Sequence, residues 1–209
     1  MLDERGVPAM VTCMGANAEL TSAEVRVAID QLDGRVLLTQ FEIPPAVALE
    51  AARYAKQRGM LTIVNPAPAP TEPLSGLEAA DILLPNESEA RQLLGLPLDA
   101  QIEDALLATR LREQSGAGCV LITLGERGLV GVDAQGAWSL EPPVVQAADT
   151  SGAGDVFCAA LALSLARGSK LRNATAWACR AAALSVTRPG TIPGFPTLDE
   201  VEAFSLEVR

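Results

Sequence analysis

The sequence predicts a three-layer α/β fold in which a mostly parallel sheet is flanked by helices. Two observations carry this prediction. Short apolar runs alternate along the chain with longer amphipathic stretches, the pattern that strand–helix repeats produce. Hydrophobic residues make up 49% of the 209 residues, and the mean hydropathy is +0.23. That content is enough to bury a sheet inside one domain of this length.

Four short apolar runs indicate buried strands, at 36–40, 61–65, 82–85 and 119–124. Longer stretches with an apolar face indicate helices, at 45–58, 87–95, 101–115, 153–167 and 173–187. Two further runs, 129–132 and 137–140, are joined by four turn-forming residues and predict a β-hairpin on the later half of the sheet. No internal repeat and no long linker divides the chain.

Composition excludes several classes of function. The formal net charge is −10, from 16 basic and 26 acidic residues, and no cluster of Lys and Arg interrupts this acidity, so nucleic acid and anionic membranes are poor partners. The chain has no histidine, which excludes Ser-His triads and His-ligated zinc. Its four cysteines are far apart and are expected to be free thiols. No signal peptide and no spanning apolar run is recognised, so a cytoplasmic location is expected.

The segment 149–155, Asp-Thr-Ser-Gly-Ala-Gly-Asp, lies between a strand-like run and a long alanine-rich helix. The small residues Gly152, Ala153 and Gly154 allow backbone N–H groups to approach a ligand, and the helix N-terminus adds partial positive charge there. Asp155 puts a carboxylate beside this anion hole, where it could accept the proton of an attacking hydroxyl. The alternative is that the small residues only permit close packing and Asp155 is an ordinary first-turn acid.

Two other segments follow predicted strands, at the edge where parallel sheets bind their ligands. Asn86 and Glu89 have the spacing of a capping box, which needs no ligand, although a carboxylate here would also suit a hydrated Mg²⁺ ion. The segment 123–128 contains two glycines, which could form a simple turn or a loop that approaches a nucleotide. Local sequence leaves both alternatives open at each segment.

Several segments together resemble the ribokinase-like (PfkB) family of sugar kinases. The matching stretches follow one another in the family's order and spacing over nearly the whole chain: 15–18, 40–42, 65–68, 85–90, 121–125 and 149–155. The resemblance implies a three-layer ribokinase-like fold. It also implies an ATP-dependent kinase that transfers the γ-phosphate to a sugar hydroxyl, with D-ribose as the foremost acceptor and ribose 5-phosphate as the product.

The resemblance also implies roles for individual residues. Asp155 becomes the catalytic base and, together with Glu42, a contact to the sugar. The anion hole is formed at Gly152, Ala153 and Gly154. ATP is expected at Asn86, Thr123, Gly125, Gly128, Gly154 and Cys179, and Mg²⁺ near Glu89 through water. A monovalent cation such as K⁺ is expected at Asp149, Ser151, Ser185, Arg188, Gly190 and Gly194. Local sequence favours Cys179 as a small buried hydrophobe, and Glu42 could simply be an exposed loop residue. Gly194 replaces a serine that is common in the family.

The N-terminal part departs from the family pattern. The family's first strand, with its sugar-binding aspartate, and its Gly-Gly-Lys-Gly-Ala-Asn segment have no counterpart here. Residues 1–17 are expected to be a remnant of the lid and its return to the core, with 9–14 as a lid strand, and 18–209 the nucleotide-binding and catalytic domain. Weak or absent turnover is therefore expected. Homodimers through lid strands are common in the family.

Two other functions stay open on the sequence alone. The chain could be a noncatalytic nucleotide-binding module that uses the anion hole without transferring phosphate. It could also be a PfkB-type kinase for another sugar or for a nucleoside, because the segment that would decide the acceptor has no counterpart.

Overall fold

Six strands form one sheet, and their order across the sheet is their order in the chain. The computed structural model describes residues 13–207. The first four strands are parallel and the last two are antiparallel, as a hairpin added to the sheet. They are β1 (Val36–Thr39), β2 (Leu61–Val64), β3 (Ile82–Leu83), β4 (Cys119–Thr123), β5 (Leu129–Asp133) and β6 (Gly136–Leu140).

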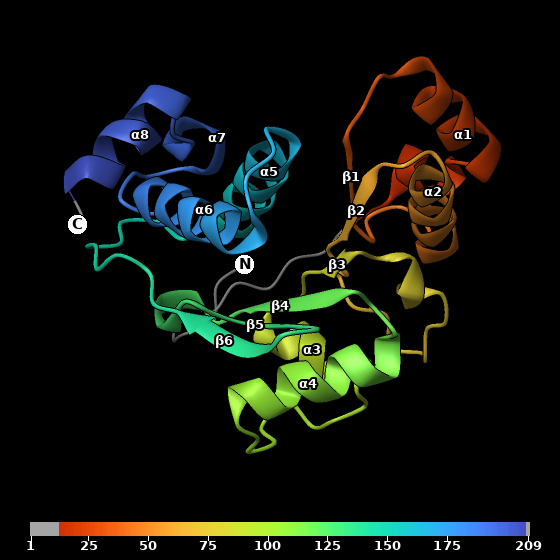
Figure 1. The fold of residues 1–209 in the computed structure, drawn as a ribbon, viewed down its shortest axis with the longest axis horizontal. Coiled ribbons are helices and arrows are strands. Elements are labelled where there is room, and N and C mark those ends of the chain that lie inside the picture. Colours follow the sequence, from red (N-terminus) through yellow and green to blue (C-terminus); the bar gives the residue numbers. More distant parts are fainter. Residues whose placement is uncertain (1–12, 208–209) are drawn as a thin grey trace.

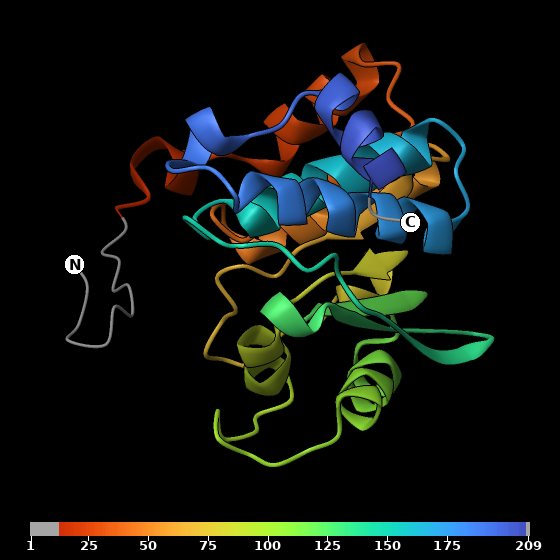
Figure 2. The same cartoon turned by 90° about the vertical axis from the view of Figure 1, so that its left-hand side faces the viewer.

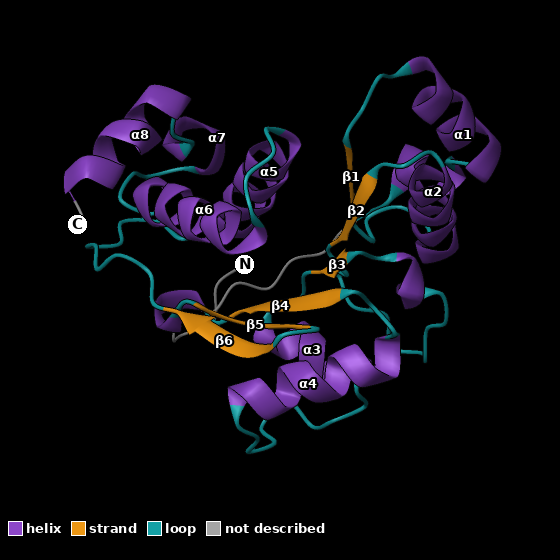
Figure 3. Ribbon diagram, in the orientation of Figure 1, coloured by secondary structure: helices purple, strands orange, loops and turns teal. Residues whose placement is uncertain are grey.

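Helices cover both faces of this sheet, which curves around α5 and α6 (Figure 1). On the outer side α1 and α2 lie beside β1 and β2, while α3 and α4 lie under β4 and β5 (Figures 1 and 3). Figure 2 shows these layers from the side, with α3 and α4 on one side of the strands and α6 on the other. The helices are α1 (Ser22–Gln31), α2 (Pro45–Gln57), α3 (Glu87–Leu93), α4 (Asp104–Ser115), α5 (Ala153–Ala166), α6 (Leu171–Ser185), α7 (Thr191–Gly194) and α8 (Leu198–Glu207). Three 3₁₀ turns are η1 (Gly15–Glu19), η2 (Leu77–Ala79) and η3 (Gly125–Arg127).

The sheet has one hydrophobic core on each of its faces. Each buried strand contributes side chains to both cores, because successive side chains point to opposite faces of a sheet. In β4, Val120 and Ile122 join the core beneath α2, α3 and α4, whereas Cys119 and Leu121 join the core beneath α5 and α6. All four side chains are buried. Burial of a large apolar side chain stabilises the fold by roughly 1.5–3 kcal/mol. Burial on both faces explains why these strands are continuous apolar runs in the sequence.

The three-layer α/β fold expected from the sequence is confirmed. The six strands and the five expected helices are present, with boundaries that differ by one to three residues. Three helices of the described residues were not predicted: α1, α8 and the four-residue α7. The lid strand expected at 9–14 falls mostly outside the described residues, and Cys13 and Met14 are not in a strand. In the described part of the chain, no helix combines the length and hydropathy needed to cross a bilayer.

Candidate active site

Polar side chains mark the carboxyl ends of all four parallel strands. Gln40 follows β1, Asn65 follows β2, Asn86 stands three residues after β3, and Thr123 is the last residue of β4. Backbone bonds extend the sheet beyond its strands here, since the N–H of Thr123 donates to the carbonyl of Pro85 over 3.1 Å. Parallel strands end at one edge, so these side chains gather where open α/β sheets bind ligands.

The N-terminus of α5 faces this edge. The side-chain amide nitrogen of Gln40 lies 3.5 Å from Oδ1 of Asp155, which links the first turn of α5 to the end of β1. The N–H of Ala153 donates to the carbonyl of Thr150 at 3.3 Å. Within residues 13–207, the N–H groups of Gly154 and Asp155 have no hydrogen-bond acceptor. These two donors, at the positive end of a helix dipole, form an anion-binding site beside the Asp155 carboxylate.

Gly152 sets the sharp turn that begins α5. Its φ is +80°, in the left-handed region that glycine adopts without strain. A Cβ atom at this position would lie 2.6 Å from the methyl group of Thr191 and 2.8 Å from Cε1 of Phe195. The α7 turn therefore packs directly against the backbone of the anion hole. Sequence reasoning identified the small residues, but not the two side chains that require one of them.

Glu89 and Asn86 form the capping box of α3, as the alternative interpretation of the sequence predicts. The Asn86 N–H donates to Oε2 of Glu89 over 2.8 Å, and the Glu89 N–H donates to Oδ1 of Asn86 over 2.9 Å. Burial raises the pKa of Glu89. Among the described residues, none donates to its Oε1 atom, which leaves one oxygen of a half-buried carboxylate for other contacts.

The negative charges of Glu89 and Asp155 both raise the pKa of one thiol, that of Cys158. The pKa of Cys158 is raised to about 12, first by burial and then by the negative charges of Asp155 and Glu89. The two carboxylates thus flank one region of the site from different helices. In the described range no group of three or more Asp, Glu, Cys or His side chains could hold a metal ion by itself. The donor chemistry fits a Mg²⁺ ion that keeps most of its waters and is shared with phosphate oxygens.

The loop between β4 and β5 is closed by its own backbone. The N–H of Leu124 donates to the carbonyl of Gly128 over 2.8 Å, and the N–H of Gly128 donates to the carbonyl of Gly125 over 3.0 Å. Gly128 has φ +85°, and a Cβ there would lie 2.0 Å from the carbonyl oxygen of Leu140. The glycine is therefore required by the β5–β6 hairpin. Gly125 has open space above it, so its backbone is accessible to a ligand.

Arg127 holds the same loop on the neighbouring helices. Its guanidinium pairs with Glu87 of α3 at 2.7 Å and with Asp104 of α4 at 2.6 Å. These contacts are solvent-exposed, so their main effect is to orient the loop rather than to stabilise the fold.

Glu42 and Cys179 occupy contrasting positions. Glu42 is exposed and stands two residues beyond Gln40 on the loop that leaves β1. Cys179 is buried in α6 within the core that contacts α5, and burial raises the pKa of its thiol to about 12. A neutral buried thiol behaves as a small hydrophobe. If Cys179 contacts a nucleotide, it would do so by shaping the pocket and not through charge.

The six residues expected around a monovalent cation lie close together, on the segment before α5 and on the segment that runs from the end of α6 through α7. The Asp149 carboxylate accepts the N–H of Ser151 and the N–H of Gly190, each at 2.9 Å, and these bonds lower its pKa. A Cβ at Gly194 would lie 3.3 Å from the carbonyl oxygen of Ser185 and 3.5 Å from that of Arg188. Carbonyl groups from the end of α6 thus converge near the start of α5, and side-chain identity alone could not reveal them.

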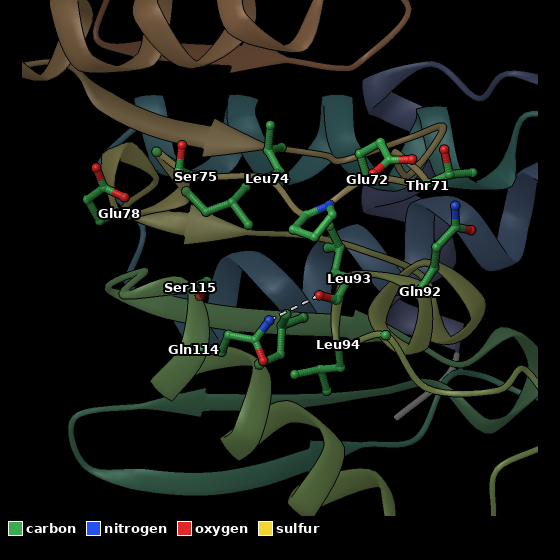
Figure 4. A pocket seen from close by; sticks show the side chains of 15 residues that line it. Thr71, Glu72, Leu74, Ser75, Glu78, Gln92, Leu93, Leu94, Gln114 and Ser115 are labelled. Atoms are coloured by element: carbon green, nitrogen blue, oxygen red, sulfur yellow. Dashed lines mark hydrogen bonds between the residues drawn. The ribbon is translucent and has the colours of Figure 1, made fainter.

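A cavity of about 450 Å³ lies elsewhere, between the 71–78 segment and the ends of α3 and α4 (Figure 4). Leu74, Leu93 and Leu94 line it together with polar side chains, and the amide of Gln114 donates to the carbonyl of Leu93 over 3.2 Å. None of the strand-end residues or the α5 amides lines this cavity. The candidate site is therefore identified by its chemistry and not by its volume.

Comparison with known proteins assigns the family. The family model described as "pfkB family carbohydrate kinase" matches residues 1–198. The chain belongs to the PfkB family. Ribokinase of Haemophilus influenzae is 33% identical over 196 residues, a match that covers 93% of this chain and 64% of that protein. Ribokinase of Bacillus subtilis is 35% identical over 199 residues, with coverage of 94% and 64%.

Solved structures agree with this membership. Ribokinase from Thermotoga maritima superimposes with a TM-score of 0.84 at 32% identity, covering 98% of this chain and 67% of that one. Ribokinase from Arabidopsis thaliana, solved with ribose and ATP, gives a TM-score of 0.83 at 26% identity, with the same coverage. The chain spans just under two thirds of the length of the two bacterial ribokinases named above.

Proposed function

We propose that this PfkB-family protein transfers the γ-phosphate of ATP to a sugar hydroxyl, with D-ribose as the preferred acceptor and ribose 5-phosphate as the product. One observation carries the proposal. The Asp155 carboxylate stands at the N-terminus of α5 beside two backbone N–H groups that have no acceptor in the described residues. A general base and an anion-binding site are thereby adjacent, which is what in-line transfer to a hydroxyl requires.

Each part of the site then has a defined task. The N–H groups of Gly154 and Asp155 hold phosphate oxygens and stabilise the charge that develops on them. Asp155 accepts the proton as the acceptor oxygen forms its bond to phosphorus and the bond to the leaving ADP oxygen breaks. The 123–128 loop is proposed to contact the nucleotide through Thr123, Gly125 and Gly128, with Asn86 on the same side and Cys179 shaping the base pocket.

The residues around Glu89 are proposed to hold Mg²⁺ through water, because Oε1 of this half-buried carboxylate has no donor among the described residues. Bound there, Mg²⁺ would neutralise charge on the phosphates. A K⁺ site is proposed at the carbonyl groups of Ser185 and Arg188, next to Asp149. Glu42 is proposed to contact the sugar.

The first test is ATP-dependent phosphorylation of D-ribose with Mg²⁺ and K⁺. We expect turnover to fall at least 100-fold in Asp155→Asn, the order of magnitude that loss of a general base costs. Asp33→Asn makes the same chemical change on an exposed residue of the chain and should leave turnover intact. Equal turnover in wild type and Asp155→Asn would contradict the role of the base. D-fructose and a nucleoside, offered as alternative acceptors, test the choice of sugar.

A second function would use the same free N–H groups of Gly154 and Asp155 to bind phosphate without transferring it. It is a noncatalytic nucleotide-binding module. The discriminating result is ATP binding, measured by calorimetry, that persists in wild type and in Asp155→Asn while neither phosphorylates any acceptor.

A further inference from the structure

Asp155 makes one side-chain hydrogen bond to the described residues, and its partner lies 115 residues earlier in the sequence. The amide nitrogen of Gln40 is 3.5 Å from Oδ1 of Asp155 and 3.1 Å from Oδ1 of Asn65. The amide nitrogen of Asn65 donates to the carbonyl oxygen of Leu84 over 2.6 Å. A chain of two amides thus runs from the end of β3, past β2 and β1, to the carboxylate on α5.

The direction of every bond in this chain follows from its fixed end. The Leu84 carbonyl can only accept, so the group of Asn65 that faces it is the NH₂ and the group that faces Gln40 is the oxygen. Gln40 must then present its own NH₂ to Asn65. The same NH₂ group has a second proton, which is directed to Asp155. The carboxylate therefore receives an N–H at Oδ1.

We infer that Gln40, held by Asn65, is a positioning residue that occupies Oδ1 of Asp155 and leaves Oδ2 as the oxygen that accepts the proton of the substrate hydroxyl. The inference rests on the proposed role of Asp155 as the base. An amide suits this task because it donates a hydrogen bond but cannot take the proton itself. The 3.5 Å separation is long, as catalytic hydrogen bonds often are before substrate binds, and it is expected to shorten in the complex.

The surroundings support a role in orientation. Both amides are half-buried at strand ends, where rotation of the side chain is restricted, whereas Asp155 itself is exposed on the first turn of α5. The backbone next to Gln40 is also held by a hydrogen bond, in which the N–H of Phe41 donates to the carbonyl of Ala67 over 2.9 Å. An exposed carboxylate is thus contacted by a donor that the sheet keeps in place, and in this way a supporting group can preorganise a reacting one.

The hydrogen bond can be tested without any turnover. In the ¹⁵N-labelled full chain, the side-chain NH₂ signals of Gln40 are identified by their loss in Gln40→Leu. We expect them to move in Asp155→Asn, which removes the negative charge they face, and in Asn65→Leu, which removes the other partner. Asp33→Asn, at an exposed carboxylate outside the site, should leave them in place. Gln40 signals that do not respond to Asp155→Asn would overturn the inference.

Kinetics then test the consequence for catalysis. Gln40→Leu should lower kcat about tenfold, equivalent to about 1.4 kcal/mol, while the KM for ATP stays within about twofold. Gln40→Glu keeps the size of the side chain but faces Asp155 with a second carboxylate, so a larger loss of kcat is expected. An unchanged kcat in Gln40→Leu, or a loss explained wholly by a lower melting temperature, overturns the positioning role. If wild type itself has no turnover, the proposed function fails, and the spectra still decide whether Gln40 engages Asp155.

Discussion

Gly152 and Gly154 are two residues apart in the same motif, yet they have different physical requirements. Gly152 has φ +80°, and its Cβ would collide with Thr191 and Phe195. Gly154 is helical, and a Cβ there would meet no atom within 4 Å. A glycine that is needed for the fold therefore stands beside one that is needed only where a ligand approaches.

We predict that Gly152→Ala destabilises the protein by about 1–3 kcal/mol, because a left-handed conformation and two close contacts must both be relieved. Gly154→Ala should leave stability unchanged or raise it slightly, because alanine is the better helix former. Its methyl group should nevertheless weaken ATP binding, since it stands at the anion-binding amides. Urea unfolding and calorimetric ATP titration of both variants check the prediction, and equal destabilisation by the two would contradict it.

For individual residues, the sequence predicted which site residues lie together when those residues are neighbours in the chain. The anion hole and Asp155 lie within one seven-residue segment, so their proximity follows from chain connectivity alone. The contact between Gln40 and Asp155 joins residues 115 positions apart and depends on how α5 docks against the sheet. Gln40 was noted in the family resemblance, but its partner could not be predicted before the packing was known.

At the scale of elements, α8 is tied to the loop that follows α6 through one ion pair. The guanidinium of Arg188 binds both oxygens of Glu200, at 3.2 and 2.7 Å. Glu200 also accepts the N–H of Thr197 over 2.7 Å at the start of α8. The hydrogen bonds from Arg188, and then that from Thr197, lower the pKa of Glu200 to about 2.

This lowered pKa predicts an acid-sensitive contact. The unfolded state binds the proton first, with a pKa near 4.5, so the stabilisation from Glu200 is complete above that pH and is lost as the pH falls toward 2. The effect is modest because both side chains are more than a third exposed. We expect Glu200→Gln to melt below wild type at pH 7 and the difference to shrink by pH 3. Thermal melts at both pH values measure this, and a constant difference would contradict it.

Helix prediction worked best where helices bury a clear apolar face. Two of the three helices that were missed bury little, because α7 has only four residues and in α1 only Ile29 is buried. One signal was available, because Thr21 and Glu24 form a capping box in which the Glu24 N–H donates to the Thr21 hydroxyl oxygen over 3.3 Å. The same signal at Asn86 and Glu89 was recognised because an apolar strand precedes it.

At the scale of the whole molecule, the two cores depend on different parts of the chain. The core beneath α2, α3 and α4 is complete by the end of β5. The opposite face of the sheet, with Ile63, Leu121 and Leu129, is covered by α5 and α6. A chain that ends at Gln146 should therefore expose this face. We expect it to bind the dye ANS and to lose cooperative unfolding, whereas a cooperative melt like that of the full chain would contradict this division.

The order of the strands has a consequence for how the protein is made. Because each strand pairs with the one synthesised just before it, the sheet can be assembled progressively as the chain leaves the ribosome, without waiting for a distant partner. The helix that carries Asp155 emerges only after the last strand. The nascent protein thus builds its scaffold first and acquires its candidate base last, so an interrupted translation product would hold the strand-end side chains but no means of proton transfer.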